Sequence, residues 1–434
     1  MALQVASATE SQLAIVIPAL NERSNLELLL PAIREMVDTL GVRTEIVVVD
    51  GGSHDGTREA AEQRGARVVQ QVERGYGGAL LAGFHVATAP YVVTMDADLS
   101  HRPVFLWEFW KRRDEAELLI ASRYVQGGQA DMSRTRRLLS LSLNAVYRKM
   151  LSLPFRDLSS GFRMYRRDVV RNLDIAARDF DALEEILIRT HAAGWRVAEV
   201  PFHYMARGTG RSHVRLMRFG LAFLRTLLRM WRLRNSVAAA DYDDRAFDSV
   251  IWLQRYWQRT RHRIVLGYLE ERTAILDVGC GTSRIILDLP GAIGLDVQQN
   301  KLRWLRPRHR RLTRGDCRAL PFKDGCCGTV IHSEVIEHVP DRLDILQEVW
   351  RVLRPGGIAI VGTPDYGRWL WWVLEWIYGK IHPEGYAHEH ITHFTRATLM
   401  SRLQEAGFDI LDCRYVGFCE MILKARKRAG PGSR

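Results

Sequence analysis

The chain has 434 residues, 47% of them hydrophobic, and carries a formal net charge of +12. This length exceeds one ordinary hydrophobic core and predicts two or three domains, while the positive charge favours anionic partners, either nucleic acid or a phospholipid surface. No stretch offers the roughly 18 uncharged apolar residues of a membrane-spanning helix, and the segment MALQVASATE lacks the basic and apolar parts of a signal peptide.

All six cysteines fall in the C-terminal half of the chain, and no Cys-x-x-Cys pair is matched by a second one. This pattern indicates neither a zinc site nor a disulfide framework, so we expect reduced thiols and a cytoplasmic protein. The six are Cys280, Cys317, Cys326, Cys327, Cys413 and Cys419.

Strand-like apolar runs alternate with helical patterns along the whole chain, which is typical of parallel sheets covered by helices. The first series of expected strands comprises Leu13–Ala19, Glu45–Asp50, Ala66–Gln71, Tyr91–Asp96, Glu117–Tyr124 and Arg196–Tyr204. The second series comprises Ala274–Gly279, Ala292–Val297, Arg311–Asp316, Gly328–Glu334, Gly357–Thr363, Asp409–Val416 and Met421–Lys427. Between them lie a basic helical segment and the polar join SVAAADYDD, which predicts domains at residues 1–213 and 236–434 with a helix at 214–235.

Acidic and small turn residues follow several strands of the first series. The first strand ends in IPALNERSNL, the second in VVVDGGSHDGT, and Asp96 and Asp98 follow a later strand in MDADLSH. Asn21, Asp50 and Ser53 could merely cap the following helices. Because all these segments end at the edge where open α/β sheets bind ligands, a nucleotide-diphosphate pocket explains them better, with a divalent metal on the two carboxylates.

The first half of the chain resembles the family-2 glycosyltransferases with a GT-A fold, within them the dolichol-phosphate mannosyltransferase branch. The matching segments are IPALNE, VVDGGSHDGT, RGYGGALLAGF, MDADLSH, ASRYVQGG, LPFRDLSSGFRMYRR, AGWRVAEVPFHY and RGTGRSHV. The resemblance implies inverting transfer of a hexose, with GDP-mannose as the expected donor, to a polyprenyl phosphate.

The resemblance also implies roles for individual residues. Asp96 and Asp98 would hold Mg²⁺ or Mn²⁺, which neutralises the leaving diphosphate. The nucleotide sugar would be bound by Pro18, Asn21, Glu22, Asp50, Ser53 and Asp96. A polyprenyl phosphate is already an anionic nucleophile, so the site needs a cationic clamp more than a strong base. The catalytic candidates are the clamp residues Arg123, Arg137 and Arg211, together with Glu185.

Two positions depart from the pattern of this family. Ser100 stands where a third metal-side residue, often Gln, is usual, and this places the rest of the metal shell in question. Gly51 replaces the second Asp of a VDDGS motif, which leaves guanine and uracil open as the base.

The segment from Arg207 to Arg234 contains eight arginines and no acid. On a helical wheel, Phe219, Phe223, Leu227 and Met230 lie on one side, and Arg218, Arg225, Arg229 and Arg232 lie on the other. This is the pattern of a helix lying on anionic lipid, and we expect peripheral association with the inner face of the cell membrane. The alternative is a helix docked on the protein's own core. Nucleic acid is not expected, since no aromatic-basic platform accompanies the charge.

The second half contains a strand, a Gly-rich turn and a helix start in ILDVGCGTSRIILDL, followed by AIGLDV, RLTRGDCRALPF, VIHSEVIEHV and LRPGGIAIVGTPD. Over residues 242–425 this series resembles the class I S-adenosylmethionine-dependent methyltransferases, which have a Rossmann-like fold. The resemblance implies that Asp277, Gly279 and Gly281 surround the methionine part of S-adenosyl-L-methionine. Asp296 would bind its ribose, and Asp316 with Cys317 would flank its adenine. Ser283 replaces a common third glycine.

Glu337 and His338 follow the fourth strand of the second series and would lie near the transferred methyl group. His338 could accept the acceptor's proton, although a purely structural pair is an equal alternative. His388, His390 and His393 in HEHITHF could form a metal cluster, an interpretation that the sequence favours only weakly. The Trp-rich segment Trp369–Tyr378 is expected to cover the acceptor pocket or to contact a membrane interface.

The sequence therefore predicts two α/β domains in a bifunctional enzyme, a polyprenyl-phosphate glycosyltransferase joined to a methyltransferase. Two alternatives remain open. The first domain could act on a glycan or glycolipid, and one of the two domains could serve only as a binding or scaffold module.

Overall fold

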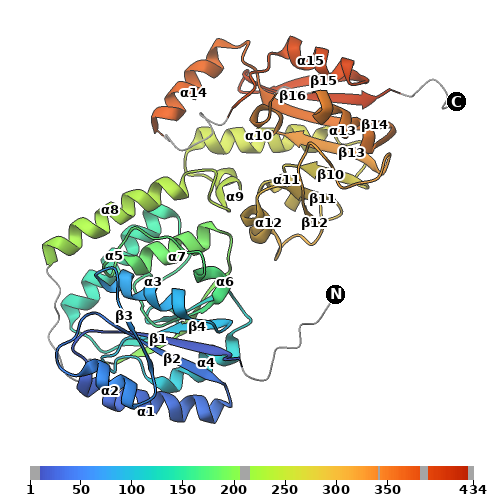
Figure 1. The fold of residues 1–434 in the computed structure, drawn as a ribbon. Helices are drawn as coiled ribbons and strands as arrows, with labels where there is room; N and C mark the ends of the chain where they lie inside the picture. Colours follow the sequence, from blue (N-terminus) through green and yellow to red (C-terminus); the bar gives the residue numbers. More distant parts are fainter. Residues whose placement is uncertain (1–9, 206–215, 341–342, 382–389, 429–434) are drawn as a thin grey trace. The chain divides into compact units, whose positions relative to one another are not determined.

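The computed structural model describes residues 10–205, 216–340, 343–381 and 390–428. The chain forms two compact units, and each is described by itself. The first contains the residues up to His191 together with Trp195–Trp231, and the second contains Ala192–Gly194 and the chain from Arg232 onward. Figure 1 shows an α/β arrangement in both units.

The first unit is built on a seven-stranded sheet with the order β3-β2-β1-β4-β7-β5-β8. Its strands are β1 (Leu13–Ala19), β2 (Thr44–Asp50), β3 (Arg67–Gln70), β4 (Tyr91–Thr94), β5 (Leu118–Ser122), β7 (Arg163–Arg166) and β8 (Val197–Pro201); β6 (Gln129–Ala130) and β9 (His203–Tyr204) form a separate pair. The sheet is parallel except at β7, which runs antiparallel to both β4 and β5.

Helices cover both faces of this sheet because its central strands are apolar on both sides. Leu13, Ile15 and Ile17 of β1 pack in one core with α1 and α4, whereas Val16 faces Gly83 of α3 on the other side. Figure 1 shows α1, α2 and α4 below the sheet and α3 above it. The helices are α1 (Arg23–Leu40), α2 (Thr57–Gln63), α3 (Tyr76–Val86), η1 (Pro103–Phe105), α4 (Leu106–Arg112), α5 (Arg134–Leu151), α6 (Arg167–Val170), α7 (Ala182–Ala192) and α8 (Leu216–Arg234).

The basic helix α8 docks on the first unit. Its Thr226 and Arg229 side chains donate to Asp181 (2.7 Å) and Glu185 (2.6 Å), and the Tyr147 hydroxyl of α5 donates to the backbone oxygen of Phe223. Leu227 and Met230, which the wheel assigns to a lipid-facing side, are buried. That assignment is wrong for these two residues, since their side chains are buried in the protein's own core.

The second unit is built on a seven-stranded sheet with the order β12-β11-β10-β13-β14-β16-β15. Its strands are β10 (Ile275–Val278), β11 (Ile293–Asp296), β12 (Leu312–Arg314), β13 (Cys327–Ser333), β14 (Leu353–Pro364), β15 (Phe408–Val416) and β16 (Glu420–Lys427). The sheet is parallel as far as β14, and β16 pairs antiparallel with both β14 and β15.

Two apolar cores lie on opposite faces of the second sheet. One contains buried residues of α10, α11 and α12, and the other contains those of α13 and α15. The helices are α9 (Tyr242–Phe247), α10 (Trp252–Tyr268), α11 (Arg284–Leu287), α12 (Gln299–Leu305), η2 (Ile336–His338), α13 (Leu343–Val352), α14 (Trp369–Ile381) and α15 (Arg396–Glu405).

Every strand expected from sequence is present, with bounds that differ by a few residues. Sequence reasoning missed β6 and β7, and it took both sheets as parallel. All six cysteines are free thiols. Among the helices of the described residues, none combines the length and the apolar character needed to cross a bilayer.

Candidate functional sites

The first candidate site lies at the carboxyl edge of the first sheet. From β1 the chain proceeds to β2 and β3 on one side, and β4 then returns to the other side of β1. In open α/β sheets this reversal opens a crevice beyond the strand ends, where ligands bind. Ala19 is opposite Asp50, and Thr94 is opposite Val16. Asp50 therefore ends its strand at this edge, and Asn21 and Asp96 follow strands that end there.

Two loops that carry predicted nucleotide-binding residues are joined to each other. The amide of Asn21 donates to Ser53 Oγ (2.8 Å), and Asn21 Oδ1 accepts from the amide of His54 (3.0 Å). Asp50 is buried and accepts from the amide of Ser53 (3.1 Å). Asn21 itself has a positive φ of 57°, a conformation that Asn tolerates better than most residues. The structure thus brings Asn21, Asp50 and Ser53 together. The backbone amide of Glu22 donates a hydrogen bond to the Thr57 hydroxyl (2.9 Å), which attaches Glu22 to the same loops.

Asp96 and Asp98 follow β4 but differ in their surroundings. The Asp96 side chain is 25% exposed and accepts from the Tyr76 hydroxyl (2.9 Å). Asp98 is buried, and its Oδ1 accepts from the Ser100 hydroxyl (2.5 Å) and amide (3.1 Å). Ser100 therefore orients Asp98. The two carboxylates and the serine are hard oxygen groups of the kind that Mg²⁺ or Mn²⁺ takes.

Tyr76 and Gly161 are two members of this site that sequence reasoning left without a role. Tyr76 stacks on Phe180 at 4.6 Å, and burial, followed by the Asp96 charge, raises its pKa well above the usual value. The hydroxyl is therefore a firm donor to Asp96. A Cβ at Gly161 would lie 2.7 Å from the Tyr76 hydroxyl. Both residues lie in segments that match the family, RGYGG and LSSGF, so the resemblance could have indicated a role for them.

Of the three arginines expected to clamp phosphate, the structure describes Arg123 and Arg137. Arg123 forms a bidentate pair with the buried Asp157, with distances of 2.7 and 2.6 Å, and also donates to Ser159. Its guanidinium fork is thus occupied. Arg137 is exposed on α5, and Arg211 lies outside the described residues. The role of Arg123 as a phosphate clamp stays a prediction, and in this structure its Nε and Nη2 bind protein acceptors.

Glu185 stands apart from the predicted catalytic group. Its side chain is fully buried on α7, and it accepts from the amide of Ala177 (2.8 Å), from Arg189 (2.8 Å) and from Arg229 (2.6 Å). A carboxylate with this many protein donors has little capacity left for a substrate. Glu185 anchors α8 in the structure, and a catalytic role for it is not supported by this geometry.

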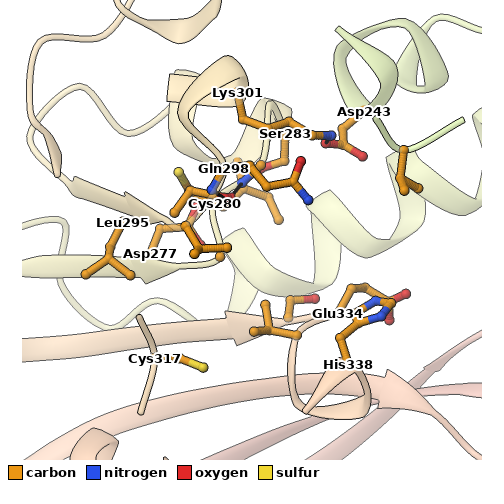
Figure 2. A pocket seen from close by; sticks show the side chains of 18 of the residues that line it. Asp243, Asp277, Cys280, Ser283, Leu295, Gln298, Lys301, Cys317, Glu334 and His338 are labelled. Carbon is orange, nitrogen blue, oxygen red and sulfur yellow. Dashed lines mark hydrogen bonds and ion pairs between the residues drawn. The ribbon is translucent and has the colours of Figure 1, made fainter. Parts of the chain in front are cut away.

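The second candidate site is a cavity of about 680 Å³ in the second unit. It opens beyond the carboxyl ends of β10, β11 and β13, where β13 returns to the other side of β10. Figure 2 shows Asp277, Cys280 and Ser283 along the Gly-rich turn, Cys317 across from them, and Glu334 and His338 at the other end. All six predicted cofactor-binding residues (Asp277, Gly279, Gly281, Asp296, Asp316 and Cys317) line this cavity.

The Gly-rich turn requires its glycines. Gly279 and Gly281 have φ values of 66° and 51°, a region that glycine enters without steric cost. A Cβ at Gly279 would collide with the Val335 side chain. Beneath the turn, Asp277 is buried and its Oδ2 accepts no hydrogen bond within the described chain. Burial, with a smaller effect from Asp296, raises the pKa of Asp277 to about 8.

Asp296 and Asp243 hold the turn from two sides. Asp296 accepts from the amides of Gly281 (2.9 Å) and Gln298 (2.8 Å), and its pKa is raised, mainly by burial. Asp243 Oδ2 accepts from the amide of Thr282 (3.1 Å) and from Lys301 Nζ (2.9 Å). Asp243 belongs to the segment SVAAADYDD, which was interpreted as a polar join between domains. Nothing in the pattern DYDD marked Asp243 as a residue of the site.

At the far side, Asp316 and Cys317 follow β12. Asp316 pairs with Arg318 at 2.5 Å, and this hydrogen bond lowers the pKa of Asp316 to about 2. Burial raises the pKa of Cys317 to about 11, so its thiol is neutral. A neutral thiol beside the expected adenine position suits a flat, uncharged base.

Glu337, His338 and His390 lie together at the end of β13. Glu337 is fully buried, and its Oε2 accepts from Thr363 (3.0 Å). The rings of His338 and His390 are 5.0 Å apart. Of the expected histidine cluster, His388 lies outside the described residues and His393 stacks on Tyr366 at 4.0 Å. Among the described residues, His390 groups with Glu337 and His338 and not with His393, and a cluster that includes His388 stays a prediction.

Comparisons with known proteins bear on both units. The profile "Glycosyl transferase family 2" matches residues 14–174. The chain is 32% identical over 210 residues to an undecaprenyl-phosphate mannosyltransferase of Micrococcus luteus, a match that covers 45% of this chain and 85% of that protein. The chain belongs to glycosyl transferase family 2. A polyprenol monophosphomannose synthase of Mycolicibacterium smegmatis is 34% identical over 213 residues, covering 46% of this chain and 79% of that protein.

A further relative of this family 2 chain is a dolichol-phosphate mannosyltransferase of Pyrococcus furiosus, 33% identical over 214 residues. That match covers 47% of this chain and 59% of the relative, so the chain spans little more than half of that protein's length. The profile "Methyltransferase domain" matches residues 276–361. This family 2 member therefore carries a methyltransferase domain in its second unit, and both matching families are transferases.

Solved structures resemble each unit of the family 2 chain. Glucosyl-3-phosphoglycerate synthase from Mycobacterium tuberculosis, in complex with Mn²⁺ and UDP, is 24% identical with a TM-score of 0.41, covering 51% of this chain and 80% of that one. An S-adenosylmethionine-dependent methyltransferase from Thermotoga maritima is 21% identical with a TM-score of 0.37, covering 43% and 94%.

Proposed function

We propose that the chain is a bifunctional enzyme. Its first unit transfers a hexose, mannose from GDP-mannose, to a polyprenyl phosphate with inversion, and its second unit transfers a methyl group from S-adenosyl-L-methionine. The observation that carries the first activity is the match over 85% of an undecaprenyl-phosphate mannosyltransferase, with Asn21, Asp50 and Asp96 placed at the sheet edge. The cavity around the Gly-rich turn carries the second.

In the first unit, Asp96 and Asp98 would hold Mg²⁺ or Mn²⁺, which neutralises charge on the leaving diphosphate. Tyr76 and Ser100 keep the two carboxylates in place through their hydroxyls. The Asn21 and Asp50 loops bind the nucleotide. Because Nε and Nη2 of Arg123 are paired with Asp157, those two atoms can meet a substrate phosphate only by exchanging partners. Arg137 and Arg211 are the remaining members of the proposed clamp.

A polyprenyl phosphate is embedded in a membrane, and the first unit presents a surface suited to reach it. Helices α5 and α8 contain no acidic residue, and they meet through the hydrogen bond from Tyr147 to Phe223. Their exposed apolar residues are Leu138, Leu139, Leu141, Val146, Met150, Leu221, Leu224 and Leu228. Leucine next to arginine on an exposed helix favours an anionic lipid surface. We therefore propose peripheral binding at the cytoplasmic face of the cell membrane.

In the second unit, S-adenosyl-L-methionine supplies a methyl group on a sulfonium centre. The residues present fit this cofactor, because Asp277 offers a buried oxygen that accepts no hydrogen bond from the described chain. The ammonium group of the cofactor would satisfy it. Asp296 would receive the ribose hydroxyls while holding Gly281 and Gln298. Glu337 and His338 would lie near the methyl acceptor.

The test is an assay of the full-length protein with radiolabelled GDP-mannose, UDP-glucose or UDP-N-acetylglucosamine, Mg²⁺ and undecaprenyl phosphate. We expect label in the lipid phase only with GDP-mannose and only when the metal is present. Label transferred to a glycan or glycolipid, with none on the polyprenyl phosphate, would replace the proposed acceptor. Calorimetry with S-adenosyl-L-methionine tests the second unit separately, and absence of binding would reduce that unit to a scaffold.

A further inference from the structure

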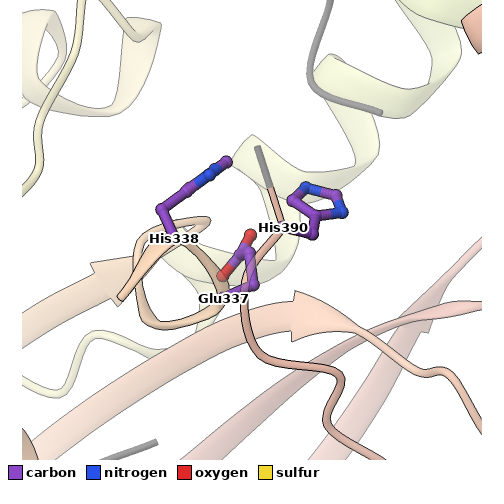
Figure 3. Close-up of side chains that lie close together, drawn as sticks. All are labelled: Glu337, His338 and His390. Atoms are coloured by element: carbon purple, nitrogen blue, oxygen red, sulfur yellow. The ribbon is translucent and has the colours of Figure 1, made fainter. Parts of the chain in front are cut away.

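Glu337, His338 and His390 form a compact group of metal-binding side chains. Glu337 and His338 belong to η2, directly after β13, and His390 precedes α15. One ligand atom from each of the three lies within 4.8 Å of the other two. Figure 3 shows the Glu337 carboxylate directed toward the space between the two imidazole rings. Residues from segments far apart in the sequence thus converge on one point.

The backbone fixes this arrangement. The Glu337 carbonyl oxygen accepts from the amides of Ile391 (2.8 Å) and Thr392 (3.0 Å), and the Thr392 hydroxyl donates to the carbonyl of Val339 (2.6 Å). These bonds attach the segment that carries His390 to η2. The three side chains therefore meet because main-chain bonds hold their segments together, and a ligand would find most of the site already formed.

One oxygen of the group lacks a partner. Glu337 is 0% exposed, and its Oε1 accepts no hydrogen bond from any described residue, whereas Oε2 accepts from Thr363. A buried polar atom without a partner is costly and rare in native proteins. A cation between Glu337 and the two imidazoles would supply the missing interaction.

The surroundings of His390 match those of a metal-bound histidine. Its side chain is 4% exposed, and its Nδ1 lies 3.1 Å from Glu375 Oε1 and 2.8 Å from the Tyr366 hydroxyl. The Tyr366 hydroxyl itself donates to Glu375 (2.7 Å), so Nδ1–H is the natural donor to this carboxylate. A carboxylate that receives the proton of one ring nitrogen leaves the other nitrogen, Nε2, as a lone-pair ligand.

We propose that Glu337, His338 and His390 bind a divalent first-row transition ion at one end of the cofactor cavity. Two imidazoles and one carboxylate suit Zn²⁺, Fe²⁺ or Mn²⁺ better than Mg²⁺ or Ca²⁺, which prefer oxygen ligands alone. Three protein ligands leave coordination positions open. His338 also lines the cavity, so an oxygen of the methyl acceptor can occupy such a position.

This role replaces proton transfer by His338, because a histidine that binds a metal through its lone pair cannot accept a proton there. The metal would lower the pKa of a bound hydroxyl instead, and the proton would pass to solvent. The inference rests on the proposed methyl transfer only for this use of the metal. It favours acceptors that carry a hydroxyl group able to bind a metal.

The test measures metal content and is independent of enzyme activity. Full-length protein is stripped with a chelator, incubated with ZnSO₄, passed over a desalting column and analysed by mass spectrometry for zinc. Glu337→Gln and His390→Ala should each lose one equivalent of zinc relative to the wild type. His393→Ala is the matched control, because it removes another histidine three positions along the same segment. It should keep the full content.

Circular dichroism and gel filtration establish whether each variant is folded. If His390→Ala does not fold, Glu337→Gln, which preserves the shape of the side chain, is used for the zinc measurement. Equal zinc content in the wild type, Glu337→Gln and His390→Ala would overturn the proposal. Calorimetry with S-adenosyl-L-methionine on the wild type separates the two ideas. Cofactor binding without the zinc difference refutes the metal site alone, and the zinc difference without cofactor binding refutes the proposed methyl transfer.

Discussion

The pair between Asp243 and Lys301 offers a stringent test of how the methyltransferase domain is built. Asp243 lies on α9, before the segment that the methyltransferase profile matches, and its Oδ2 accepts from both Lys301 Nζ and the amide of Thr282. The side chains are 14% and 4% exposed. Replacing Asp243 with alanine would leave the Lys301 ammonium buried beside the cofactor cavity without this partner.

The expected magnitude follows from this burial. Removing one partner of a buried ion pair costs about 3–5 kcal/mol. Because Asp243 retains some contact with solvent, we expect Asp243→Ala to lower the free energy of unfolding by about 3 kcal/mol, the lower end of that range. Asp243→Asn keeps an oxygen acceptor and loses only the charge, so about 1.5 kcal/mol is expected. The affinity for S-adenosyl-L-methionine should fall about tenfold in the alanine variant, as the Thr282 amide loses its anchor.

Urea unfolding and calorimetry with S-adenosyl-L-methionine measure these two quantities. Asp248→Ala is the matched control, since Asp248 directly follows α9 and its ion pairs with Arg259 and Arg284 are largely exposed. Pairs of that kind contribute about 0–1 kcal/mol. Adding Lys301→Met to Asp243→Ala should recover part of the lost stability, because it removes the unpaired charge.

Two results would refute this reasoning. If Asp243→Ala is no more destabilising than Asp248→Ala, the buried pair does not support the turn. If Lys301→Met makes the alanine variant still less stable, the lysine does not depend on Asp243 for its charge balance.

Three further predictions concern both domains. Asp98→Asn should abolish sugar transfer and leave S-adenosyl-L-methionine binding unchanged in calorimetry; transfer that survives both this change and EDTA would contradict the metal assignment. Because the pKa of Asp277 is raised to about 8 from 3.8, the folded domain without cofactor holds a proton there that the unfolded chain releases, so stability falls as pH rises through this interval. The cofactor's ammonium group should prefer the ionised form, so its affinity should rise between about pH 6 and pH 9, a trend that Asp277→Asn should remove. The protein should co-sediment with anionic vesicles and be released by high salt, and Leu221, Leu224 and Leu228 changed together to Ser should weaken this binding; a wild type that ignores such vesicles at low salt would exclude the α5 and α8 surface.

Most strand positions were predictable from sequence because the central strands of both sheets are buried on both faces and read as continuous apolar runs. Leu13–Ala19 and Glu45–Asp50 are examples, found at Leu13–Ala19 and Thr44–Asp50. The missed strand β7 has the sequence RMYR, in which two arginines flank the apolar pair, although Arg163 is itself buried. Its antiparallel direction could not be read from its own residues, since direction depends on where the preceding segment returns to the sheet.

Sites were predictable where the residues follow strands, and much less so where they come from elsewhere. The ends of strands carry Asn21 and Asp50 in the first unit, and Asp277 and Asp296 in the second. In each unit the sheet topology alone is enough to bring the two residues to the same edge. The guanidinium of Arg123 is bound by Asp157, which lies more than thirty positions away in the sequence. His390 and Glu337, which lie close together, are also far apart in the sequence. No local pattern reports such pairings. The docking of α8 was open for the same reason, because an apolar helix side does not reveal which surface it meets.

The bond between His390 and Glu375 has a thermodynamic consequence. Glu375 lies on α14, whose outer side exposes Trp369, Trp372, Val373, Trp376 and Ile377. A metal ion on His390 would strengthen the proton donation to Glu375, and thereby the attachment of α14. By linkage, a surface that binds α14 more tightly when the metal is present must tighten metal binding by the same factor. If that outer side rests on a lipid surface, the methyltransferase domain would retain its metal more firmly at the membrane than away from it.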